Sequence, residues 1–204
     1  MKRTILAAMM VFITLALTGC GDGGSSPPPT FFTEISSDPA FDGDIQQDSI
    51  TGAFTVRQSP LTVRAGLDPL TGDEYRGFLH FSLATVPLDA VIVSATLDIV
   101  INSIVILPTA NTIPIRIELV SFQPPLADAH FDLLPLANTT FPVFRTDVGN
   151  SVRVDVTALM AEAQFRGLDN FQIRILEDFG IVSPGLIEID DTNAFAPLLE
   201  VTYF

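Results

Sequence analysis

The chain has 204 residues and a formal net charge of −14 at pH 7, and 48% of its residues are hydrophobic. This apolar content excludes a disordered chain. The acidic balance excludes nucleic acid as a partner, because phosphates and carboxylates repel each other. Acidity also has a simpler explanation, since a charged surface keeps an exported domain soluble.

The chain begins like a secreted protein. Lys2 and Arg3 are followed by an apolar run of 13 residues, Ile5 to Leu17, which only Thr14 interrupts. A membrane-spanning helix needs about 20 apolar residues, so the run is too short to span and is typical of a secretory signal.

The end of this run is more specific. Residues 17–20 read Leu-Thr-Gly-Cys, which resembles the lipobox of bacterial lipoprotein signals. The resemblance implies that Cys20 is acylated and becomes the first mature residue. The alternative is an ordinary cleaved signal with a chance cysteine. Cys20 is the only cysteine, so the sequence after it contains no disulfide or second thiolate.

Residues 21–30 form a tether. Glycine and serine make its first half flexible, and three consecutive prolines stiffen the second. In lipoprotein sorting, an aspartate directly after the cysteine favours the inner membrane. Gly21 occupies that position, so the resemblance implies the outer membrane, with Asp22 one place later as the opposing signal. The protein would then contact a membrane through its lipid.

Residues 31–204 are predicted to form one domain, organised around residues 76–101. There Leu79 and Phe81 alternate with His80 and Ser82, which predicts a strand with the first pair inward and the second on the opposite face. Similar alternation recurs along the chain between turn signals. The pattern favours an all-β fold, an antiparallel two-sheet jelly-roll-like sandwich.

One short helix is predicted after the strand around residue 154. Thr157 is the expected cap and Gly167 the expected end. The apolar stripe comprises Val156, Leu159, Met160 and Ala163. A helix of this kind would cover one open end of the sandwich.

Several segments together resemble extracellular domains of the DNRLRE type, which are related to a jelly-roll carbohydrate-binding module family. They are RGFLHFSL at 76–83, VPLDA at 86–90, VSATLDIVI at 93–101, VDVT at 154–157 and PLLEVTY at 197–203. The resemblance covers about residues 31–204. It implies a non-catalytic β-sandwich on the outer side of the cell, with polysaccharide or a surface protein as partner.

Two departures from that family bear on sugar binding. The hexapeptide of the family name is absent, and the sequence has no tryptophan, the aromatic residue best suited to stack on a sugar ring. The candidates for exposed phenylalanines are Phe31, Phe32, Phe78 and Phe179.

Catalytic signals are weak, and the sequence predicts a protein that is not an enzyme. No G-x-S-x-G motif occurs. His80 and Ser82 share a strand face but make no triad, and His130 has no second histidine at metal-site spacing. The alternative is a surface-tethered enzyme that acts on polysaccharide through a pair of carboxylates.

Two acidic loops, at residues 38–48 and 188–193, predict a structural calcium site. The first and last strands of a sandwich often meet, so loops distant in sequence would come together. Calcium takes several oxygen ligands from such loops. The predicted ligands are Asp42, Asp44, Asp190 and Asp191. The alternative is a pair of solvated turns.

Overall fold

The computed structural model describes residues 28–178 and 184–204. The predicted signal peptide, Cys20, Gly21 and Phe179 lie outside the described residues. The described part of the chain folds into twelve strands, two 3₁₀ turns and one α-helix, α2 (Thr157–Phe165). The strands are β1 (Phe31–Ser36), β2 (Gly43–Gln47), β3 (Phe54–Gln58), β4 (Thr62–Leu67), β5 (Glu74–Ser82), β6 (Ile92–Ile106), β7 (Thr112–Val120), β8 (Ala137–Phe144), β9 (Ser151–Asp155), β10 (Asn170–Glu177), β11 (Gly185–Asp190) and β12 (Leu198–Tyr203).

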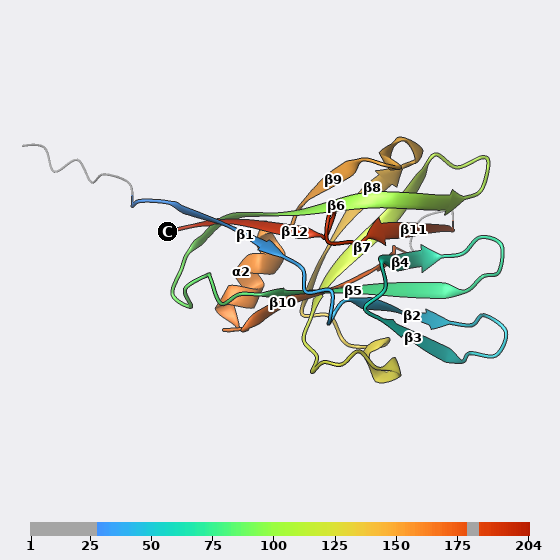
Figure 1. Cartoon of the computed structure of the whole chain (residues 1–204), viewed down its shortest axis with the longest axis horizontal. Helices are drawn as coiled ribbons and strands as arrows, with labels where there is room; N and C mark the ends of the chain where they lie inside the picture. Colours follow the sequence, from blue (N-terminus) through green and yellow to red (C-terminus); the bar gives the residue numbers. More distant parts are fainter. Residues whose placement is uncertain (1–27, 179–183) are drawn as a thin grey trace, which may run out of the picture.

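The strands form an antiparallel sandwich, as the sequence predicted (Figure 1). The small sheet has the order β1–β12–β6–β9. The large sheet runs β6–β11–β4–β5–β10–β7–β8, with the β2–β3 hairpin paired to β5. β6 has 15 residues and belongs to both sheets, because its first part pairs with β12 and β9 and its last part pairs with β11.

The main core lies between the two sheets. Leu79 and Phe81 of β5 are both 0% exposed and belong to it, which confirms the predicted register of this strand. Phe81 packs beside Phe171 of β10, with ring centroids 6.2 Å apart. Two neighbouring strands turn fully buried side chains toward the same core: Ile115 and Ile117 of β7, and Ile173 and Ile175 of β10.

The opposite face of the large sheet is also covered. Phe78, a candidate for exposure, is instead 0% exposed and belongs to a second apolar cluster. We call this cluster the outer core; it comprises Ile45, Phe78, Val120, Phe122, Leu126 and Phe131. The segment 121–136 between β7 and β8 supplies half of it and covers the sheet there, which is why Phe78 is not at the surface.

The predicted helix is α2, and its buried side chains Leu159, Met160 and Ala163 pack into the main core. Gly167 follows the helix with a φ of 64°, which suits glycine. Thr157 is not the cap. The N-cap is Val156, and the Thr157 hydroxyl instead bonds the backbone of Ala95 in β6. Among the described residues, no helix is long and apolar enough to cross a membrane.

Candidate functional site

The two acidic loops do meet at one edge of the sandwich. Asp42 directly precedes β2, and Asp191 directly follows β11. Each carboxylate and the hydroxyl of Ser37, which directly follows β1, lie close enough to shift the pKa of the other acid, but no hydrogen bond joins them. We call Asp42 and Asp191 the acid pair.

Backbone hydrogen bonds hold the acid pair in place. The His80 N–H of β5 donates to Asp42 Oδ1 at 2.7 Å. The Asp191 N–H donates to the Leu61 carbonyl at 3.0 Å, and the Ser59 N–H donates to the Asp42 carbonyl at 2.9 Å. The position of the pair is therefore fixed by β5 and by the turn between β3 and β4, which are distant in sequence from Asp191.

The acid pair is buried without enough partners. Asp42 is 0% exposed and Asp191 is 3% exposed. Asp42 Oδ2, both carboxylate oxygens of Asp191 and the Ser37 hydroxyl have no hydrogen-bond partner. Buried polar atoms are nearly always paired, and an unpaired buried charge is costly. The site therefore has the geometry to hold one positive species between the two carboxylates.

Protonation of the pair follows from the same burial. Burial, with the neighbouring Asp191 carboxylate as a second cause, raises the pKa of Asp42 to about 8. Burial also raises the pKa of Asp191 to about 6. Burial therefore favours a proton on the pair over two bare carboxylates. A bound cation is the other species that can balance the site.

The other two predicted ligands lie outside this pair. Asp44 is fully buried, but it accepts hydrogen bonds from Arg57 Nε at 2.9 Å and from the Arg64 N–H at 3.0 Å. Its charge is therefore already balanced. Asp190 Oδ1 accepts the Thr192 N–H at 2.9 Å. Across residues 28–178 and 184–204, no group of three or more His, Cys, Asp or Glu is placed to hold a metal.

Both histidines contact neighbouring residues of the fold. The His80 ring lies against Phe41, with centroids 5.0 Å apart, and burial lowers the pKa of His80. His130 Nδ1 accepts the Ala127 N–H at 3.1 Å, so it closes a local 3₁₀ turn. Sequence reasoning missed Ser37, because a single serine in a loop carries no signal of its own.

A second buried charge cluster lies beside the outer core. Arg174 of β10 and Glu118 of β7 are 3% exposed and paired, with Nε donating to Oε2 at 2.8 Å. The same guanidinium donates to the Leu133 carbonyl at 2.8 Å and to the Phe131 carbonyl. Arg76 lies over the Phe131 ring at 3.8 Å. These arginines hold the segment 121–136 on the sheet.

A groove of about 400 Å³ lies between the β5–β6 link and the residues that follow α2. Its polar lining comprises Ser82, Gln164, Asp169 and Asn170. Ligand pockets have volumes of about 300–1,000 Å³, so the groove has room for a small ligand. Asp169 is the only carboxylate among the described residues that line it.

No known protein-family model matches the sequence, and no curated protein matches it. The resemblances to lipoprotein signals and to DNRLRE-type domains therefore depend on the quoted residues alone.

Proposed function

We propose that the protein is a lipid-anchored lipoprotein of the cell envelope, held by Cys20 at the outer membrane. Its β-sandwich is a non-catalytic binding or structural module. The observation that carries this proposal is the Leu-Thr-Gly-Cys motif at the end of the apolar run. It is supported by the start of β1 at Phe31, which leaves residues 21–30 as a spacer between the lipid and the folded body.

The anchor is tested by replacing Cys20 with Ala. The wild-type protein should incorporate a labelled fatty acid and sediment with membranes in high salt. The Ala variant should incorporate none and leave the membrane, because no other apolar run of comparable length follows Cys20. Ser26→Ala, a change in the tether, is the matched control. An Ala variant that still takes up the label excludes Cys20 as the lipidation site.

The choice of membrane is tested at the neighbouring position. Gly21→Asp should move the protein from the outer-membrane fraction to the inner-membrane fraction on a density gradient. Asp22→Asn is the control that removes the nearest acid. An unchanged distribution of the Gly21→Asp variant would show that position 21 does not direct sorting here.

A binding module is favoured over a tethered enzyme by the placement of the carboxylates. Glycoside hydrolysis by the usual route needs two carboxylates about 5–10 Å apart on either side of the scissile bond. The groove has one, Asp169. The acid pair is buried, so a polymer cannot reach it.

Polysaccharide is the ligand class that we propose for the groove. Amide, hydroxyl and carboxylate side chains line it beside apolar ones, and such groups hold sugar hydroxyls by hydrogen bonds. A glycan array should show binding that Asn170→Ala weakens. Asn111→Ala, a change of an exposed residue in the β6–β7 turn, should leave binding unchanged. Product formation from a bound glycan would instead support the enzyme.

We further propose calcium as the species that the acid pair holds. Carboxylate and hydroxyl oxygens are the ligands that calcium prefers, and Asp42, Asp191 and Ser37 offer four such atoms without a partner. Asp44 is not among these ligands, because its carboxylate accepts a hydrogen bond from Arg57. The remaining ligands would be carbonyl oxygens or water.

A further inference from the structure

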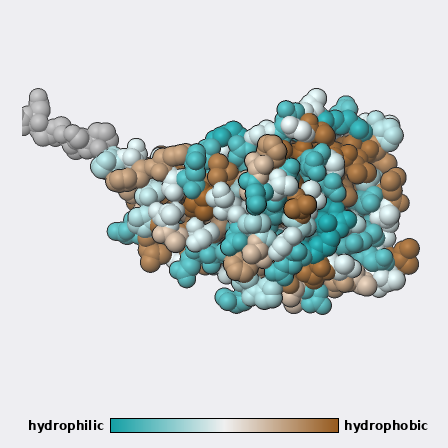
Figure 2. All heavy atoms as spheres, viewed as in Figure 1, coloured by the Kyte–Doolittle hydropathy of each residue, from teal (hydrophilic) through white to brown (hydrophobic). Residues whose placement is uncertain are grey.

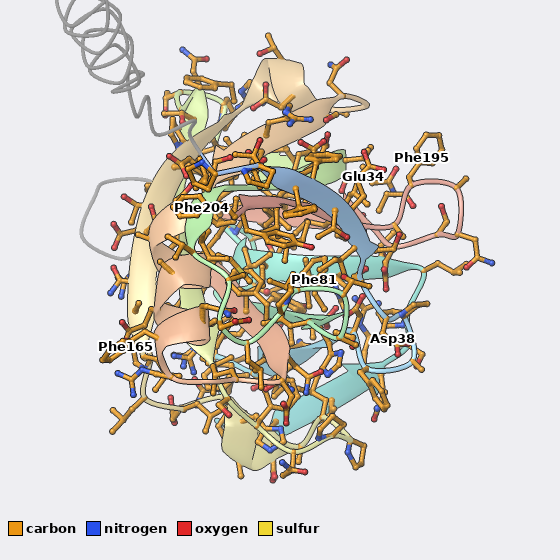
Figure 3. All side chains as sticks on the ribbon, turned by 90° about the vertical axis from the view of Figure 1, so that its left-hand side faces the viewer. Glu34, Asp38, Phe81, Phe165, Phe195 and Phe204 are labelled. Carbon is orange, nitrogen blue, oxygen red and sulfur yellow. The ribbon has the colours of Figure 1, made fainter. Side chains whose placement is uncertain are left out.

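Exposed apolar side chains gather at the end of the sandwich where β1 begins. We call this surface the apolar end; it comprises Phe31, Phe32, Leu88, Val91, Val93 and Phe204, which are 43–71% exposed. The start of β1 and the C-terminus lie together there (Figure 1). Figure 2 shows hydrophobic residues at this left-hand end, and Figure 3 looks directly onto it, with Phe204 labelled.

Three neighbouring strands place these side chains together. Phe31 of β1 pairs with Tyr203 of β12, and their rings stack with centroids 5.8 Å apart. Tyr203 pairs in turn with Ile92 of β6. Val91 and Phe204 exchange two backbone hydrogen bonds. Backbone pairing therefore fixes Phe31, Val91 and Phe204 beside one another at this end of the sandwich.

The charge of this surface indicates what it can contact. A shallow hollow of about 140 Å³ at its centre is lined by Phe31, Pro87, Asp89, Ala90, Tyr203 and Phe204. Within the part of the chain that the structure describes, this lining contains one acid and no cation. Such a surface has no attraction for anionic headgroups, and its contact with a membrane would be apolar.

We propose that the apolar end lies against the lipid bilayer that carries the anchor, a proposal that rests on the lipidation of Cys20 proposed above. Only residues 21–30 separate Cys20 from Phe31, and such a tether reaches about 15–25 Å. It leads into β1 at this end and no other. The tether gives the surface an effective concentration at the bilayer on the order of millimolar, so a weak apolar contact suffices.

The opposite end of the sandwich provides the comparison. Ile50 and Leu70 are 91% and 83% exposed, and they lie in the β2–β3 and β4–β5 turns at the far end (Figure 1). The tether does not enter there. The structure thus predicts one orientation, with the β1 end toward the membrane and these turns away from it.

The sequence contains no tryptophan, so a single introduced tryptophan is the only source of indole fluorescence in the protein. Full-length protein with Phe32→Trp or Leu88→Trp is placed in phosphatidylcholine vesicles, with bromine atoms on the lipid acyl chains as quencher. The tryptophan emission of both variants should shift to the blue and be quenched about twofold or more relative to that of Ile50→Trp. The reason is that their indole rings would lie about 5–10 Å into the membrane interface. Added anionic lipid should not increase quenching.

Vesicle flotation is measured first for every variant. If all variants float and Phe32→Trp is quenched no more than Ile50→Trp, the orientation is wrong while the anchor stands. A blue shift without quenching means that a second copy or another protein covers the surface, which overturns the proposal too. Failure to float overturns both the anchor and the orientation. Unchanged melting temperatures confirm that the substitutions leave the fold intact.

Discussion

The acid pair and the Glu118–Arg174 pair are both buried, but only one of them is electrically balanced. Arg174 meets Glu118 and donates to backbone carbonyls, so the charges there compensate each other. Asp42 and Asp191 are two acids with unpartnered oxygens. A balanced pair needs nothing from outside the chain, whereas the acid pair needs a proton or a cation. This difference separates a structural element from a candidate ligand site.

Breaking the balanced pair should give the largest effect. Arg174→Ala leaves buried Glu118 with only its longer contact to Arg116, at 3.5 Å, and should lower the free energy of unfolding by about 3–5 kcal/mol. Replacing both residues, as Arg174→Met with Glu118→Leu, should restore most of this loss, because no unpaired charge remains. Arg166→Ala, which breaks an exposed pair with Glu162, should cost about 0.3–0.5 kcal/mol. Denaturant unfolding measures all three, and equal losses in the single and double variants would contradict the argument.

A substitution in the apolar core provides a reference for these losses in unfolding free energy. Phe81→Ala should cost about 3–5 kcal/mol, because it opens a cavity between the two sheets. Phe195→Ala, a change of an exposed residue, is the control and should cost little. A loss below about 1 kcal/mol for Phe81→Ala would mean that the core collapses around the missing ring.

Calcium should stabilise the protein if the acid pair holds it. At 100 times its dissociation constant, a ligand that binds only the folded state adds about 2.7 kcal/mol, which raises the melting temperature by several degrees. A chelator should reverse the rise, and magnesium should do less. Asp191→Ala should abolish the effect, whereas Asp190→Asn should preserve it. Identical melting curves in millimolar calcium and in chelator would leave the proton as the balancing species.

If a proton balances the acid pair, its effect on the free energy of unfolding is smaller than that of calcium, and it is measured in the presence of chelator. The pKa of Asp42 is raised in the folded state from 3.8 to about 8, so the stabilising contribution is complete below about pH 4 and is lost as the pH rises through 8. Asp42→Asn keeps the acceptor for the His80 N–H and supplies a permanent amide donor.

The Asn variant should match the wild type near pH 4 and exceed its unfolding free energy by about 1–3 kcal/mol at pH 9. Asp38→Asn changes a half-buried acid in the same loop and should keep the wild-type pH dependence. Parallel pH profiles for Asp42→Asn and the wild type would show that the pair is not protonated as described.

Much of the fold could be predicted from local patterns. Alternation places Leu79 and Phe81 inward, because successive side chains on a strand point to opposite faces. The apolar stripe of α2 could be predicted in the same way, because its residues are close together in sequence. The burial of Phe78 could not be predicted in this way, because its cover comes from residues 121–136, which are distant in sequence.

The candidate site was only half predictable for the same reason. The meeting of the two acidic loops follows from the usual closure of a sandwich by its first and last strands. Which acids face each other does not, because it depends on register across strands. Asp44 is taken by Arg57, 13 residues later and across a hairpin, and composition alone cannot distinguish it from Asp42.

The membership of β6 in both sheets has a consequence for how the domain opens. Its 15 residues carry hydrogen bonds to β12 and β9 in one sheet and to β11 in the other. The sheets cannot part while this strand is intact, and the strand cannot detach without exposing both. The amide hydrogens of the two sheets should therefore exchange with solvent through one shared opening event, as they do in a single cooperative unit.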